Sequence, residues 1–157
     1  MTKITMAIDG GARRIGVART DAGRIMALPV ATLRRERYGG HLDEIVDLAT
    51  KYRADDFVVG LPLHLSGREG RAAQAAKRLA YDLAEASGIP VWLVDERLTT
   101  VQAHADLAAA GREMRLRKDV VDQASAVVLL EHVLETERRT GSRPGRRVDV
   151  KDESAHN

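Results

Sequence analysis

The stretch ITMAIDGGARRIGVA, residues 4–18, consists of two apolar runs joined by a glycine-containing turn. The first run fits a strand that is buried on both faces, and Asp9 follows at its C-terminal end. Gly10 and Gly11 permit the positive φ angles of a tight hairpin. The second run, from Ile15, is therefore expected to pair antiparallel with the first.

Asp9 has two interpretations. A carboxylate at the end of a buried strand is costly unless something positive binds it, which favours a metal ligand. Asp followed by Gly is also a common hairpin signal, which would make Asp9 an ordinary turn former. The metal-ligand interpretation requires further acids elsewhere in the chain that converge on the same point.

Length and composition set the class of protein. At 157 residues the chain has the size of one domain, and we expect residues 1–139 to form it. With 44% hydrophobic residues, no cysteine and no apolar run of membrane-spanning length, we expect a soluble, cytoplasmic protein without a membrane partner. The lack of cysteine excludes disulfides and thiolate zinc sites. Residues 140–157 combine Gly, Ser, Pro and mixed charges, which predicts a disordered tail.

Hydrophobic periodicity predicts the remaining elements. A third extended run over 25–33, in which Pro29 suits an edge strand, completes an antiparallel meander. Short apolar strands at 57–59 and 91–94 each follow a helix, which implies parallel crossovers onto the same sheet. Four helices are expected. The first begins at His41, and the second begins at a Ser66–Glu69 capping box and ends at Gly88. The third begins at a Thr99–Gln102 capping box and ends near Gly111, and the fourth begins near Asp119. The predicted fold is α/β, with a mixed sheet of five strands flanked by helices.

Acids follow the ends of two predicted strands and open the last helix. Asp95 and Glu96 come directly after the last strand, and Asp119 and Asp122 are neighbours on one helix face. In a sheet whose first strand is central, Asp9, Glu96 and Asp122 can converge, with Asp119 as a fourth oxygen donor. Such ligands suit magnesium or manganese. The simpler explanation of the two helical acids is that they favour the positive end of the helix dipole.

A cluster of this kind suits phosphodiester hydrolysis. That reaction needs an attacking hydroxide, neutralisation of the developing charge and help for the departing oxygen. Two divalent ions about 3.5–4 Å apart supply all three, so no histidine base is required.

Arginine-rich clusters accompany the acids, although the formal net charge is only +2. Arginine forks suit phosphate oxygens, so basic patches around an acidic pocket indicate a polyanionic substrate. For any single patch, a solvated surface is the simpler explanation. The clusters consist of Arg13 and Arg14, of Arg34, Arg35 and Arg37, and of Arg112, Arg115, Arg117 and Lys118.

Four sequence blocks occur in a characteristic order. They are IDGGARRIGVA from residue 8, VVGLPL from residue 58 with SGREG from residue 66, VDERLTT from residue 94, and VDQASAVVLL from residue 121. Together they resemble the YqgF/RuvX family of Holliday junction resolvases over about residues 4–136. The resemblance implies an RNase H-like fold, in which three antiparallel and two parallel strands form the sheet.

The resemblance also implies an activity and a site. It assigns Asp9, Glu96 and Asp122 as the metal-binding catalytic acids, with Asp119 as an auxiliary ligand, and two Mg²⁺ or Mn²⁺ ions. The family's activity is endonucleolytic. Its substrates are four-way DNA junctions in some members and the 5′ end of precursor 16S ribosomal RNA in others.

Further positions match or depart from the family pattern. Asp95 is expected to serve structure, and Arg97 either binds phosphate or forms a plain salt bridge. Gly10 stands where relatives carry a larger residue, and His64, where asparagine is common, is expected to pack its loop. The residues expected to contact nucleic acid are Arg13, Arg14, Arg68, Arg97, Arg115, Arg117 and Lys118.

Two other function classes remain open. The Asp-x-Gly hairpin also resembles the phosphate loop of actin and sugar kinases, but those proteins hold nucleotide between two such domains. A non-catalytic junction- or RNA-binding protein would use the arginines alone. In such a protein the three acids would repel the phosphates of the nucleic acid and would have no explained role. We favour a homodimer, because symmetric resolution of a junction needs two opposed sites, whereas RNA trimming needs only one.

Overall fold

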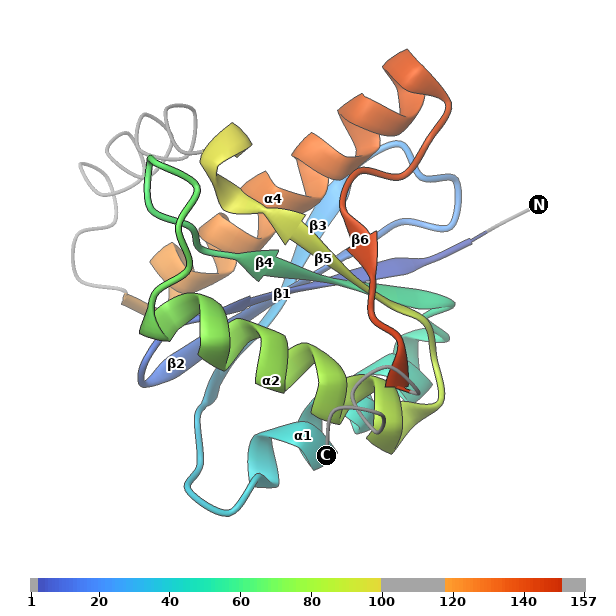
Figure 1. The fold of residues 1–157 in the computed structure, drawn as a ribbon. Coiled ribbons are helices and arrows are strands. Elements are labelled where there is room, and N and C mark those ends of the chain that lie inside the picture. Colours follow the sequence, from blue (N-terminus) through green and yellow to red (C-terminus); the bar gives the residue numbers. More distant parts are fainter. Residues whose placement is uncertain (1–2, 100–117, 151–157) are drawn as a thin grey trace.

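A mixed sheet of six strands, in the order β3-β2-β1-β4-β5-β6, forms the centre of the fold in a computed structural model (Figure 1). The structure describes residues 3–99 and 118–150, without the side chains of 98–99 and 118–122. The strands are β1 (Thr5–Gly10), β2 (Arg14–Thr20), β3 (Ala27–Arg34), β4 (Asp56–Leu61), β5 (Val91–Asp95) and β6 (Arg146–Arg147). The helices are α1 (Gly40–Tyr52), α2 (Arg71–Ser87), the short 3-10 helix η1 (Glu96–Thr99) and α4 (Lys118–Thr140).

β1 is the central strand, as its apolar sequence predicts. It pairs antiparallel with β2 and parallel with β4, and Met6, Ala7 and Ile8 are fully buried. β4 pairs parallel with β5, so the C-terminal ends of β1, β4 and β5 meet at one edge of the sheet. This edge is where the sequence places its acids.

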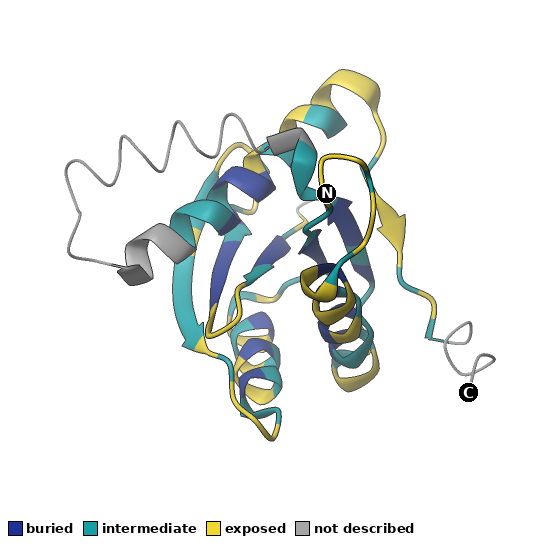
Figure 2. Ribbon diagram, turned by 60° about the vertical axis from the view of Figure 1, so that its left-hand side comes forward, coloured by how far each residue is buried: buried dark blue, intermediate teal, exposed yellow. Residues whose placement is uncertain are grey.

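Helices cover both faces of the sheet. Because side chains alternate along a strand, Met6 and Ile8 pack in the core under α1 and α2, whereas Ala7 packs in the core under α4. Figure 2 shows the buried strands between these helices, whose outer sides are exposed. None of the helices in the described part of the chain is long and apolar enough to cross a membrane.

β3 is an edge strand, which agrees with Pro29 in its sequence. The strand begins at Ala27 and not at Ile25, because Asp21 Oδ1 accepts hydrogen bonds from the amides of Ile25 and Met26 at 2.8 and 2.9 Å. These bonds hold the preceding residues in a turn.

The predicted Ser66–Glu69 capping box is wrong. α2 begins at Arg71 after Gly70, and no side chain caps it. Glu69 instead pairs with Lys77 and accepts a hydrogen bond from Gln74 of the same helix. The helix ends at Gly88 in the left-handed region, as predicted. The helix predicted from Thr99–Gln102 to Gly111 lies outside the described residues.

The chain beyond residue 140 returns to the sheet, so the predicted disordered tail is wrong for residues 141–150. β6 pairs antiparallel with β5 and makes a sixth strand where five were predicted. Arg143, only 10% exposed, bonds to Asp56 and Glu137 at 3.1 and 2.6 Å and lies over the ring of Trp92. Buried ion pairs of this kind cannot be read from local composition. Residues 151–157 lie outside the described part of the chain.

Candidate active site

Two acids meet at the C-terminal edge of the sheet. Asp9 lies at the end of β1, and Glu96 follows β5 as the first residue of η1. β4 separates the two strands, with Ile8 paired to Val59 and Gly60 paired to Val94. The site is therefore three strands wide, with β4 in its middle.

Gly60 makes room for the meeting of the two acids. A Cβ atom at this position would lie 2.8 Å from Glu96 Cδ and 3.0 Å from Glu96 Cγ, closer than real side chains pack. The Glu96 carboxyl group thus covers the bare backbone of β4 on the face that carries α4. The sequence analysis did not select Gly60. The available signal was a glycine that ends the apolar run of β4, since such a residue can mark a close approach.

The carboxyl groups of Asp9 and Glu96 are hydrogen-bonded to each other, which requires that one of them is protonated. Burial, the hydrogen bond to Asp9 and the charges of Asp9 and Asp95 together raise the pKa of Glu96 to about 9. Two carboxylates pressed together cannot both ionise cheaply in the absence of a cation. The site is therefore built to receive positive charge.

Asp95 belongs to a separate pair. It accepts hydrogen bonds from the amide and the guanidinium of Arg97, at 2.9 Å for the amide and 2.7 Å for Nη2. These bonds hold the pKa of Asp95 below its ordinary value, mainly through the Arg97 side chain. Arg97 also donates to the carbonyl of Leu65 at 3.4 Å. The salt bridge expected as one alternative is thus present, and it ties the loop after β4 to η1.

The remaining two acids lie at the start of α4. The backbone of Asp119 and Asp122 is helical, whereas their side chains lie outside the described residues. Asp122 is one turn before Ala126, which is fully buried against the sheet together with Ala7 and Val58.

Among the described side chains, no group of three or more potential ligands gathers at one point. Asp9 and Glu96 provide two carboxyl groups, and the third predicted acid falls among the side chains that are not described. The two that are seen fit a divalent cation, because both offer carboxylate oxygens and a cation could take the place of the proton that the raised pKa of Glu96 retains.

A family model described as "RuvX: Holliday junction resolvase" matches residues 3–136. The chain belongs to this RuvX family. It is 48% identical to a protein named "Putative pre-16S rRNA nuclease" from Thermobifida fusca (strain YX), over 94% of this chain and 97% of that one. A protein of the same name from Mycobacterium tuberculosis (strain ATCC 25177 / H37Ra) is 47% identical, over 83% of this chain and 77% of that one.

Solved structures confirm the predicted RNase H-like α/β fold of this RuvX-family chain. T. thermophilus RuvC in complex with Holliday junction substrate superposes with a TM-score of 0.61 at 15% identity, covering 90% of this chain and 99% of that one. The fowlpox virus Holliday junction resolvase superposes with a TM-score of 0.51 at 11% identity, covering 85% and 99%. At these identities the likeness concerns the fold alone.

Some of the arginines predicted to contact nucleic acid lie in segments that adjoin the acidic edge of the RuvX-family fold. Arg13 and Arg14 are exposed in and after the β1–β2 turn, and Arg68 is exposed in the loop after β4. Arg115 and Arg117 lie outside the described residues. The side chain of Lys118 is likewise not described.

The two departures from the family pattern have structural consequences. Gly10 and Gly11 do not take the positive φ angles that were predicted, since the turn is closed by a hydrogen bond from Gly11 N to Arg14 O at 2.7 Å. Gly10 instead provides space for the Arg35 guanidinium, whose Nη2 atom lies 2.8 Å from the place of an ideal Cβ. The exposed His64 ring lies against Gly70, and the amide of His64 closes its loop by donating to Arg68 O at 3.0 Å. This agrees with a loop-packing role.

Proposed function

We propose that this chain is a divalent-metal-dependent endonuclease that hydrolyses phosphodiester bonds in structured nucleic acid. The observation that carries the proposal is the half-buried Asp9–Glu96 pair at the C-terminal edge of the sheet. Membership of the RuvX family supports the same activity. The lack of a membrane-spanning helix in the described residues is compatible with a cytoplasmic enzyme.

Asp9, Glu96 and Asp122 are the proposed catalytic acids, and Asp119 is an auxiliary ligand. Magnesium or manganese, as two ions, would supply the hydroxide and stabilise the developing charge. Asp9, Glu96 and Asp122 would hold the ions, and Glu96 would give up its proton when a cation binds. Arg97 holds the Asp95 carboxylate in a salt bridge, so Asp95 is not proposed as a metal ligand.

The substrate proposal has two members. The names of the curated relatives point to precursor 16S ribosomal RNA, and the family description points to four-way DNA junctions. Four arginines are suited to hold phosphates beside the acids. They are the exposed Arg13, Arg14 and Arg68, and Arg97, whose side chain reaches the loop after β4. Junction resolution would require a two-fold dimer, which aligns two sites on one substrate.

The other two function classes are less well supported. Nucleotide binding between two actin-like domains does not fit a chain that matches the RuvX family over residues 3–136. Non-catalytic binding does not explain why Glu96 packs over Gly60 and is held against the Asp9 carboxyl group.

The test offers the purified protein a synthetic four-way DNA junction and a precursor 16S rRNA fragment in parallel, with Mg²⁺ or Mn²⁺. Asp9→Asn, Glu96→Gln and Asp122→Asn are each expected to lower the cleavage rate by at least about a hundredfold while the fold is retained. Glu85→Gln, an exposed acid of α2, is the matched control and is expected to cut at the parent rate. Parent-like cleavage by any of the three site variants contradicts the assignment of that residue.

A further inference from the structure

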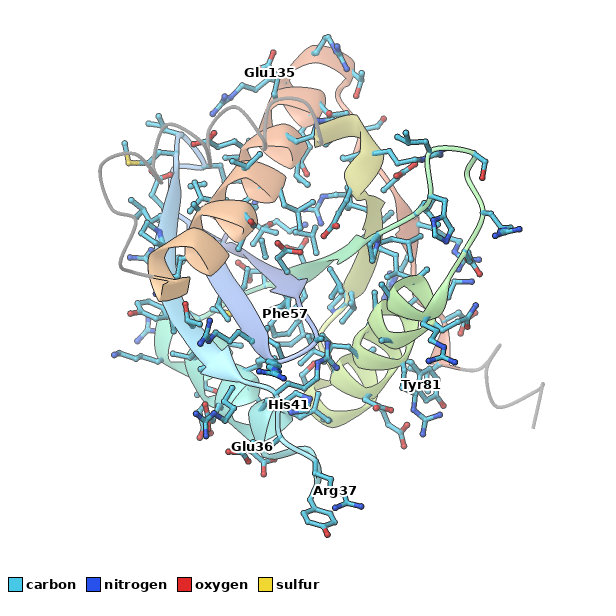
Figure 3. All side chains as sticks on the ribbon, turned by 90° about the vertical axis from the view of Figure 1, so that its left-hand side faces the viewer. Glu36, Arg37, His41, Phe57, Tyr81 and Glu135 are labelled. Atoms are coloured by element: carbon cyan, nitrogen blue, oxygen red, sulfur yellow. The ribbon has the colours of Figure 1, made fainter. Side chains whose placement is uncertain are left out.

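A hollow of about 630 Å³ lies on the face of the sheet that carries α1 and α2, beside the β1–β2 turn. Arg35 and Arg37 from the segment between β3 and α1, His41 of α1, and Arg78 of α2 are among the residues that line it. We call it the basic pocket. Figure 3 shows Glu36, Arg37 and His41 gathered where this segment enters α1, below the sheet in that view.

Arg35 is the innermost cation of the basic pocket. Its Nε atom donates to the carbonyl of Gly11 at 3.0 Å. Its Nη2 atom lies 2.8 Å from the place where a Cβ at Gly10 would be. The guanidinium therefore rests on the backbone of the turn that follows Asp9. The Arg35 side chain is half-buried, and this burial lowers its pKa.

No acid compensates this buried charge within the described part of the chain, where Arg35 forms no ion pair. Of the two acids that line the pocket, Asp82 pairs with Arg78 at 3.4 Å, and the exposed Glu36 turns its carboxylate against Gly40. A partly buried guanidinium without a counter-ion is costly unless an anion completes it. Its planar fork matches the oxygens of a phosphate group.

The pocket lies directly behind the acids. Successive side chains of a strand point to opposite faces, so Asp9 faces the α4 layer and Gly10 faces the α1–α2 layer, where Leu79 is its neighbour. The two sites are thus one residue apart along the chain, on two sides of the same strand end. A nucleic-acid strand held at the acids has a short path over this end to Arg35.

We propose that the basic pocket binds a backbone phosphate of the substrate, next to the phosphodiester bond that is cut, and that Arg35 is its main ligand. The inference rests on the proposed nuclease function and adds a contact that the sequence analysis did not assign. Arg35 is a positioning residue, since it holds the strand and does not touch the reacting atoms. The backbone phosphate is common to DNA and RNA, so the contact is expected with both.

The test measures binding at a series of salt concentrations. The full chain with Asp9→Asn, which is expected to bind without cutting, is compared with the same chain carrying Arg35→Gln. The probes are the synthetic four-way DNA junction and the precursor rRNA fragment. We expect the affinity in 0.1 M salt to fall about 3- to 10-fold and the slope of log affinity against log salt to become shallower by about one. Arg147→Gln, an exposed arginine on the opposite edge strand β6, is the matched control and is expected to retain the slope.

Arg35→Lys separates charge from geometry. Lysine keeps one positive charge but loses the fork, so the parent slope is expected to return while affinity stays at least about twofold below the parent. Chemical unfolding shows whether each variant folds. If Arg35→Gln does not fold, the proposal is tested by Arg35→Lys alone, which must bind at least about twofold more weakly than the parent. Folded Arg35 variants with parent affinity and slope on both probes overturn the pocket proposal alone. A parent protein that neither binds nor cuts either probe overturns the nuclease proposal instead.

Discussion

At the scale of single residues, the site depends on Gly60, which has no Cβ atom. The Glu96 carboxyl occupies the space that a side chain at position 60 would fill, with Glu96 Cδ only 2.8 Å from an ideal Cβ. Gly60→Ala should therefore displace Glu96 from Asp9 without disturbing the rest of the core. We expect cleavage to fall about 10- to 100-fold, as when a supporting contact of a metal site is lost.

The measurement for Gly60→Ala is the single-turnover cleavage rate beside an unfolding curve. Gly23→Ala is the matched control, because a Cβ there meets its nearest neighbour, Asp21, at an ordinary 3.4 Å. Parent-like cleavage by Gly60→Ala would show that the Glu96 position in this structure is not the active one.

The charge of Glu96 makes a second prediction. Its folded-state pKa of about 9 lies above the ordinary 4.5, so the protonated form favours folding. This contribution is complete below pH 4.5 and is lost as the pH rises through 9. In chelator at pH 8, Glu96→Gln should therefore raise the free energy of unfolding by about 1 to 3 kcal/mol, since glutamine cannot ionise.

Urea unfolding at pH 8 and at pH 4.5 measures this effect. The gain should vanish at the lower pH, and Glu85→Gln, an exposed acid, should show no gain at either. Equal stability of the parent and Glu96→Gln at pH 8 would argue against a buried carboxyl pair.

At the scale of elements, β6 is held by a buried ion pair as well as by its two residues of strand pairing. Arg143 bonds to Asp56 and Glu137, and Asp56 is 2% exposed. Arg143→Met would remove this partner from buried Asp56 and half-buried Glu137, although Lys3 also reaches Asp56 at 3.1 Å and Arg24 also pairs with Glu137. We expect a loss of about 3 kcal/mol in the free energy of unfolding.

Hydrogen exchange of the Val148 amide, which donates to Val91 O at 2.8 Å, reports on the segment itself. Its protection should fall in Arg143→Met. Arg147→Met, an exposed residue of β6, is expected to change stability by less than about 0.5 kcal/mol. Unchanged protection of Val148 in Arg143→Met would mean that the strand pairing alone holds the segment.

At the scale of the whole molecule, the proposed metal binding would be linked to folding through the proton on Glu96. A cation must displace the proton shared by Asp9 and Glu96, so its affinity should rise with pH up to about 9. Metal bound only to the folded state stabilises that state. The rise in Tm caused by Mn²⁺ should therefore be larger at pH 8 than at pH 6.

Glu96→Gln is the control, because it has no acidic proton at this position to exchange. Its response to Mn²⁺ should be small and should change little with pH. A rise in Tm of the parent protein that is equal at pH 6 and pH 8 would show that the ion does not bind at the shared-proton site.

The sequence by itself determined the central strand, the order of the elements and the acids at the strand ends. These follow from local pattern, because an apolar run such as Met6–Ile8 must be buried on both faces and Asp9 must then emerge at its end. The family resemblance added the assignment of Glu96 and Asp122. Turn and cap details were less predictable, as the Gly10–Gly11 turn and the start of α2 show, because several backbone conformations suit the same residues.

Only the tertiary structure decided which distant residues touch. Three contacts join segments that are far apart in the sequence, so no local sequence pattern predicts them. They are Gly60 with Glu96, Arg35 with Gly10, and Arg143 with Asp56 and Glu137. Each contact depends on how layers pack and on which charges are buried together, and burial is a property of the assembled sheet and helices. The sequence therefore located the acidic edge, whereas the fold created the shared proton and the basic pocket behind it.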